Sequence, residues 1–132
     1  MTLSMTQIIE QNITTAIKST FSDYEVISCP TNYENFSSSE GAIFVKFIRT
    51  EYQSQNTVWE VNQDARSYFE ILSCYRSVQS YSEIYVPQQQ LKDVIQGLEI
   101  LGRRITLVRE EFVKEKNTDV YFRLVCEINH RL

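Results

Sequence analysis

The amino-acid sequence predicts one α+β domain over residues 1–132, a mainly antiparallel sheet with two helices packed on one face. Apolar residues recur at helical spacing in two segments and at strand spacing in five. The elements follow in the order helix, short strand, two long strands, helix and two strands. With 3 Gly and 2 Pro in the chain, no stretch resembles a linker between domains.

The first predicted helix covers residues 5–21, and a short strand follows at Tyr24–Ser28. Ser4 or Thr6 is suited to cap the amino end of the helix, because a side-chain oxygen there accepts from free backbone N–H groups. The apolar stripe of the helix consists of Ile9, Ile13, Ala16, Ile17 and Phe21.

The most apolar strand lies in the stretch S-E-G-A-I-F-V-K-F-I-R-T-E-Y, residues 39–52. Its alternate positions load both faces of the sheet, with Ile43, Val45 and Phe47 on one side and Ala42, Phe44 and Ile48 on the other. Residues 51–64 are largely polar and predict a long loop or an extended hairpin arm. Alternation returns over residues 65–76, which predicts a strand antiparallel to the preceding one.

The second helix is predicted over Pro87–Leu101, with Pro87 at the first helical position and Gly102 as the C-cap. Its apolar stripe consists of Leu91, Val94, Ile95, Leu98 and Leu101. A final hairpin is predicted to turn at residues 116–118 and to return through Val120, Phe122, Leu124, Cys126 and Ile128.

Two helices cover only one side of a sheet, whereas the strand at residues 42–48 is apolar on both sides. In one alternative, neighbouring subunits cover the second side, since large exposed apolar patches usually mark an interface. In the other, the chain's own segment 30–40 or 51–64 folds over it, with Tyr33 and Phe36 as anchors of the former. The sequence alone leaves both alternatives open.

The charge and cysteine patterns exclude several classes of protein. The net charge is −4, and Arg103-Arg104 is the only adjacent basic pair, so tight DNA binding is not expected. Cys29, Cys74 and Cys126 lack metal-ligand spacing and suggest a reducing cytoplasm. We also expect no signal peptide and no membrane span.

No group of residues forms a catalytic motif. His130 is the only histidine, and we expect it to be exposed and without function because chain ends tend to fray. Glu110 and Glu111 are adjacent in a strand, so their side chains should point to opposite faces. Without a nucleophile motif, a phosphate loop or paired metal ligands, we predict no enzyme, no cofactor and no metal.

Trp59 is a candidate for contact with a partner because it lies with Val58 and Val61 in an otherwise polar segment. Trp is over-represented among interface hot spots. The alternative is that Trp59 folds back onto the core of its own domain. Tyr52 supports a similar but weaker argument.

Four stretches resemble the tail terminators of Mu-like contractile-tailed phages, and together they span nearly the whole chain. They are I-I-E-Q-N-I-T-T-A-I-K-S-T-F with a following strand that ends in C-P, G-A-I-F-V-K-F-I-R-T-E-Y, V-N-Q-D-A-R-S-Y-F-E-I-L-S-C-Y-R and R-E-E-F-V-K-E-K-N-T-D-V-Y-F-R-L-V-C-E-I. The chain departs from the family pattern at Pro87, where an unbroken helix is expected, and at the turn 116–118, which lacks Gly.

The resemblance implies a virion protein without catalytic activity that assembles as a homo-oligomeric ring, commonly a hexamer, at the head-proximal end of the tail. Such a ring caps the tail tube and sheath and joins them to a neck or connector protein. DNA only passes through its lumen, which suits an acidic subunit. The subunit would be made in the cytoplasm of the bacterial host, and no membrane is involved.

On this reading, the expected ring or tail contacts are Phe44, Lys46, Ile48, Tyr52, Trp59 and Val61, with Arg103 and Arg104 as polar contacts. A neck or head-completion protein is one alternative, and it would contact the portal side instead. A cap protein of a phage-derived contractile injection system is another. An enzyme is the most distant alternative.

Overall fold

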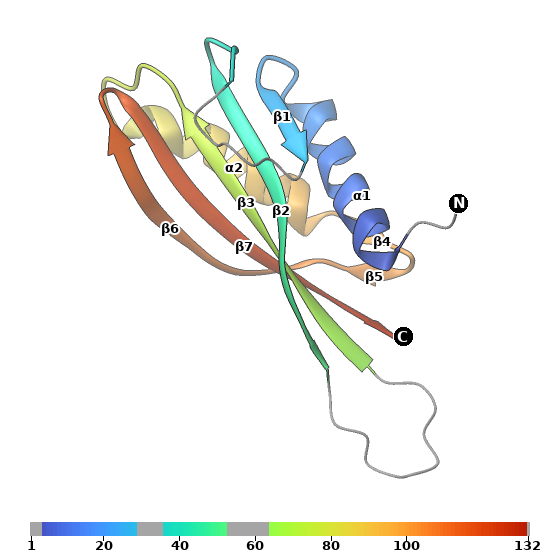
Figure 1. Ribbon diagram of the computed structural model, residues 1–132. Coiled ribbons are helices and arrows are strands. Elements are labelled where there is room, and N and C mark those ends of the chain that lie inside the picture. Colours follow the sequence, from blue (N-terminus) through green and yellow to red (C-terminus); the bar gives the residue numbers. More distant parts are fainter. Residues whose placement is uncertain (1–3, 29–35, 53–63, 132) are drawn as a thin grey trace, which may run out of the picture.

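The computed structural model describes residues 4–28, 36–52 and 64–131 (Figure 1). Its elements are α1 (Met5–Thr20), β1 (Glu25–Ser28), β2 (Gly41–Tyr52), β3 (Asp64–Tyr75), α2 (Ser82–Gln96), β4 (Glu99–Ile100), β5 (Arg103–Arg104), β6 (Thr106–Lys116) and β7 (Asp119–Arg131). Five strands form one sheet in the order β1-β2-β3-β7-β6, while β4 and β5 form a separate ribbon. Both helices lie on the same side of the sheet (Figure 1), so the predicted α+β architecture is confirmed.

The sheet is mainly antiparallel and has edges of unequal length. β1 runs parallel to β2 and pairs only with Ala42–Val45. The pairs β2–β3, β3–β7 and β6–β7 are antiparallel. β6 forms the opposite edge along its full length. Because β1 is short, β2 continues beyond it from Lys46 to Tyr52 with its outer edge uncovered by β1.

α1 forms where the sequence predicts it, and Ser4 caps it. Ser4 Oγ accepts from the backbone N–H of Gln7 at 3.1 Å, and Gln7 Oε1 accepts from the N–H of Ser4 at 2.9 Å. This reciprocal capping box satisfies two backbone donors at the helix start. Ile9, Ile13 and Ile17 are at most 1% exposed, so the predicted stripe is the buried face of the helix.

The side of the sheet that packs against the helices, called the helix face below, carries the main core. Burying each of its aliphatic side chains stabilises the fold by about 1.5–3 kcal/mol. Edge-to-face packing of Phe47 and Phe69, with ring centroids 5.7 Å apart, extends this core along β2 and β3. Its sheet residues include Ile43, Val45, Phe69, Ile71, Leu124, Cys126 and Ile128.

The second helix lies earlier in the chain than predicted. α2 begins at Ser82, and Pro87 lies inside it rather than at its first position. The reason is burial, because Ile84 in the first turn is 1% exposed and packs with Tyr75 and Val120. The side chain of Glu83 also accepts from the backbone N–H of Gln79 at 2.9 Å, which stabilises the entry to the helix.

The predicted end of this helix is also wrong, because the chain turns into the β4–β5 ribbon. Gly97, not Gly102, caps α2. Leu101 (φ 52°) and Gly102 (φ 77°) are both in the left-handed region, as a two-residue turn between strands requires. Ile100 and Ile105 are 3% and 2% exposed and attach the ribbon to the core. Leu98 and Leu101 mimic a continued helical stripe, which explains the error.

The side of the sheet facing away from the helices, called the outer face below, divides into two halves. In the half near β1, called the closed half, Phe36 packs over a buried apolar cluster of Ala42, Phe44, Leu72, Cys74 and Tyr121. Phe36 is 8% exposed and meets Phe44 edge to face at 5.9 Å. Of the two alternatives for the second apolar side, a cover from the chain's own 30–40 segment is therefore present at Phe36.

Candidate assembly surface

The other half of the outer face, called the open half below, carries charged and aromatic side chains around a hollow of about 280 Å³. The hollow lies over four neighbouring strands, β2, β3, β7 and β6. It is lined by Ile48, Arg49, Tyr68, Glu70, Val108, Arg109, Arg123 and Val125. The buried apolar pattern of β2 ends here, because the exposed Lys46 follows the apolar residues that Phe36 covers.

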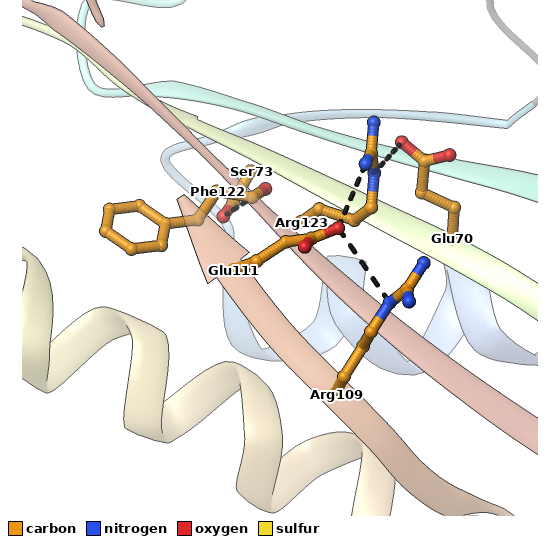
Figure 2. Close-up of polar contacts among 6 residues, drawn as sticks. All are labelled: Glu70, Ser73, Arg109, Glu111, Phe122 and Arg123. Atoms are coloured by element: carbon orange, nitrogen blue, oxygen red, sulfur yellow. Dashed lines mark hydrogen bonds and ion pairs between the residues drawn. The ribbon is translucent and has the colours of Figure 1, made fainter. Parts of the chain in front are cut away.

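Arg123 on β7 is the centre of an ion-pair network in the open half (Figure 2). Its Nε donates to Glu70 Oε1 at 3.1 Å, and one terminal nitrogen donates to Glu111 Oε1 at 3.0 Å. Arg109 Nε lies 3.8 Å from the same oxygen of Glu111. The strand order brings β3, β7 and β6 side by side, so residues distant in sequence meet. Hydrogen bonds to Glu70 and then Glu111 raise the pKa of Arg123.

A second polar group lies toward β2. The guanidinium carbon of Arg49 lies 4.2 Å from the centroid of the Tyr68 ring, a cation–π geometry. The hydroxyl of Tyr68 donates to Glu51 Oε2 at 2.9 Å, and Arg49 pairs with Glu51 at 3.4 Å. Burial raises the pKa of Tyr68, and its hydrogen bond with Glu51 raises it further, while a hydrogen bond with Arg66 opposes the shift.

Two irregularities in the ladders bring apolar residues to the same hollow. The register shifts between Phe47 and Arg49 on β2, and again between Leu107 and Arg109 on β6. Each shift leaves one residue without a partner, Ile48 and Val108, and these are 36% and 46% exposed. Bulges re-aim side chains at sheet edges. The open half thus combines two apolar residues with bonded charges, which suits contact with a protein.

The structure distributes the residues predicted to make contacts rather than gathering them in one place. Phe44 is fully buried in the closed half, so its side chain serves the core of its own subunit. Ile48 lines the open half, and Lys46 is exposed beside it on β2. Tyr52, 57% exposed, ends β2.

The remaining predicted contacts lie elsewhere. Arg103 and Arg104 are exposed on the separate β4–β5 ribbon, away from the hollow of the open half. Trp59 and Val61 lie outside the described residues. The open half therefore contains only part of the predicted set.

One exposed apolar patch was not predicted from the sequence. Tyr81, Tyr85 and Val86 at the start of α2 and Phe112 on β6 are 43%, 67%, 65% and 50% exposed. The rings of Tyr81 and Phe112 lie 6.4 Å apart, and Tyr81 donates to Glu115 at 2.7 Å. The predicted helix start at Pro87 placed three of these residues before the helix, which hid their common surface.

His130 contradicts the prediction that it is exposed. It is 8% exposed, and β7 holds it opposite Ala65 on the helix face. Its Nε2 shares a hydrogen bond with Ser67 Oγ at 2.7 Å, and burial lowers the pKa of the imidazole. The prediction failed because β7 extends to Arg131 instead of fraying.

The adjacent acids Glu110 and Glu111 behave as predicted. Glu110 pairs with Lys92 of α2 at 3.1 Å, whereas Glu111 pairs with Arg123 on the outer face. Within the described ranges, no cluster of three or more His, Cys, Asp or Glu residues has the geometry to hold a metal ion. No helix among the described residues is long and apolar enough to cross a membrane.

The fold resembles proteins of known structure at low sequence identity. One is a chain from the virion of a native gene transfer agent particle, with a TM-score of 0.65 and 10% identity over 97% of this chain and 98% of that one. A second solved structure gives a TM-score of 0.57 and 8% identity over 95% of this chain and 92% of that one. No protein-family model matches the sequence. No curated protein matches it either.

Proposed function

We propose that this protein is a structural subunit of a phage-like particle. The observation that carries the proposal is the near-complete correspondence with one virion chain, which covers 97% of this chain and 98% of that one. Because nearly all of both chains is matched, the similarity extends over the whole of that virion chain and is not limited to one part of it. The open half of the outer face supports the same reading, because its charges are bonded to one another and its apolar residues face solvent.

Within that class, we propose the tail terminator as the particular role. In this role the subunits form a ring of six that caps the head-proximal end of the tail and meets a neck or connector protein. Heterologous contacts that close on themselves give a ring rather than a filament. The open half on one side and the patch of Tyr81, Tyr85, Val86 and Phe112 on another offer two different surfaces, as a heterologous contact needs.

Deleting the gene in the particle that encodes it tests the terminator role. We expect tails of irregular and excessive length in electron micrographs, because nothing stops the polymerisation of tube and sheath. Supplying the wild-type gene in trans should restore uniform length. Tails of normal length without heads would instead support a neck or head-completion protein, and intact infectious particles would refute a structural role.

The assembly state of the purified protein is a separate test. Mass photometry at micromolar concentration should show a closed oligomer, and addition of tail tubes should increase its fraction. A protein that stays monomeric with and without tubes would contradict the ring.

A further inference from the structure

A second hollow, of about 200 Å³, lies apart from the open half, between the start of α1, the β4–β5 ribbon and the end of β7. Its apolar wall includes Met5, Ile100, Leu101 and Ile128, and two nitrogen-bearing side chains, Arg103 and His130, complete it. Small-molecule pockets usually measure about 300–1,000 Å³. At about 30 Å³ of liquid volume for each water, the hollow has room for one large side chain.

His130 forms a polar part of this wall and lacks a hydrogen bond on one side. Its Nε2 is held by Ser67 Oγ at 2.7 Å, and that hydroxyl is in turn 2.8 Å from Thr50 Oγ1. Its Nδ1 is enclosed and has no hydrogen-bond partner in the structure. Buried polar atoms are nearly always bonded. Because His130 lines the hollow, this nitrogen is a candidate partner for a polar group that enters from outside.

Arg103 places a positive charge at the rim of the hollow, and Arg104 is its neighbour on β5. Arg103 and Arg104 are exposed, and neither makes a side-chain hydrogen bond or ion pair within the described part of the chain. Glu99 faces Arg104 across the ribbon without forming an ion pair. Leu101 at the tip is 66% exposed and held in a left-handed conformation, which is unusual for a residue with a branched side chain.

We propose that this hollow is the socket for an acidic contact segment of a neighbouring virion protein, one that presents an apolar side chain next to a carboxylate. The apolar side chain fills the space between Ile100, Leu101 and Ile128. The carboxylate pairs with Arg103 at the rim, and a polar atom of the same segment bonds to His130 Nδ1. That the neighbour is a virion protein rests on the proposed function, whereas the chemistry of the socket does not.

Hexanoate is a suitable probe, because it combines an apolar tail with a carboxylate. His130 is the only histidine, so its ring gives a single set of NMR signals that report binding without ambiguity. We expect hexanoate to shift these signals and a methionine methyl signal saturably. Hexylammonium, with the same tail and the opposite charge, should bind at least tenfold more weakly. Shifts that are absent, unsaturable or equal for the two probes would overturn the proposal.

Two variants assign the binding to the rim. Arg103→Ala should reduce hexanoate affinity about tenfold while leaving the dispersion of the spectrum, and hence the fold, unchanged. Lys18→Ala is the matched control, because Lys18 is an exposed cation at the other end of α1. Equal affinities of Arg103→Ala and the wild type would overturn the role of Arg103.

The partner itself is tested in particles. The double variant Arg103→Glu/Arg104→Glu should be depleted from purified particles at least tenfold by quantitative mass spectrometry, whereas Lys18→Glu should be incorporated normally. Normal incorporation of the double variant would overturn the socket as a virion contact. If the wild type itself is absent from particles, the proposed function fails, and the hexanoate titration still decides the chemistry of the socket.

Discussion

The two halves of the outer face differ in their exposure to solvent. In the closed half, Phe36 covers Phe44, and Arg76 lies 4.0 Å above the Phe36 ring while donating to the Phe36 carbonyl at 2.7 Å. In the open half, nothing within the described residues covers the sheet, and the side chains of Arg123 and Glu111 are 35% and 41% exposed, whereas Glu70 is 16% exposed. The same strands form both halves, so the change occurs within each strand.

This difference bears on where the proposed contact with neighbouring subunits lies. The apolar second side of β2, from Ala42 to Phe44, is already buried by the chain itself. Neighbours are therefore not needed to hide it. What remains exposed and apolar in the open half is Ile48 and Val108, set among bonded charges. Such a surface suits the protein contact that we propose for it.

The largest expected effect is in the closed half. Phe44→Ala removes a fully buried ring, and we expect it to lower the free energy of unfolding by about 3–5 kcal/mol. Tyr52→Ala, at a position 57% exposed on the same strand, should change it by less than about 0.5 kcal/mol. Urea denaturation of both variants measures the contrast. Similar losses for the two would contradict the difference in burial between the two ends of β2.

Phe36→Ala should open the closed half, with a loss of about 3 kcal/mol in the free energy of unfolding, because the ring is buried between the apolar cluster and Arg76. Cys74 lies beneath Phe36, and burial raises its thiol pKa to about 11. The variant should be alkylated by iodoacetamide at Cys74 at least tenfold faster than the wild type. Cys126, in the helix-face core with a pKa raised to about 12, is the internal control.

Mass spectrometry of the alkylated peptides separates local opening from global unfolding. Equal acceleration at Cys74 and Cys126 would indicate global unfolding. No acceleration at Cys74 would mean that Phe36 is not its cover.

More of the closed half than of the open half could be predicted from the sequence. The two-sided pattern of β2 and the anchoring role of Phe36 could be predicted, because alternation and an isolated aromatic residue are local signals. The Arg123 network could not, since it joins three strands whose neighbours depend on sheet order. The bulges at Ile48 and Val108 were also unpredictable, because each is a break in register between two strands and leaves no pattern in either strand alone.

The second helix shows the same limit. Its apolar spacing was visible, but its start depends on Ile84 packing against residues from two strands. The socket beside His130 depends on β7 continuing to Arg131, and a lone histidine near a chain end gave no signal of this.

A smaller effect is expected in the open half. Arg123→Ala leaves Glu70, whose side chain is 16% exposed, without its cation, and we expect a loss of about 1–2 kcal/mol in the free energy of unfolding. Arg109→Ala removes an exposed pair and should cost less than about 0.5 kcal/mol. Raising the salt concentration should shrink the first difference only partly, because Glu70 is sheltered. If Arg123→Ala proves neutral, the network contributes specificity rather than stability.

The smallest effect concerns the helix face behind the open half. Burial lowers the pKa of His130 below its ordinary value of 6.5, so the unfolded chain takes up a proton at a pH where the folded chain does not. Stability from this group is therefore complete above about pH 6.5 and is lost as the pH falls toward the folded pKa. His130→Gln should flatten the dependence of the unfolding free energy on pH between about 7.5 and 5.5. Equal slopes for the variant and the wild type, or an imidazole that titrates by NMR at or above 6.5, would contradict the burial of His130.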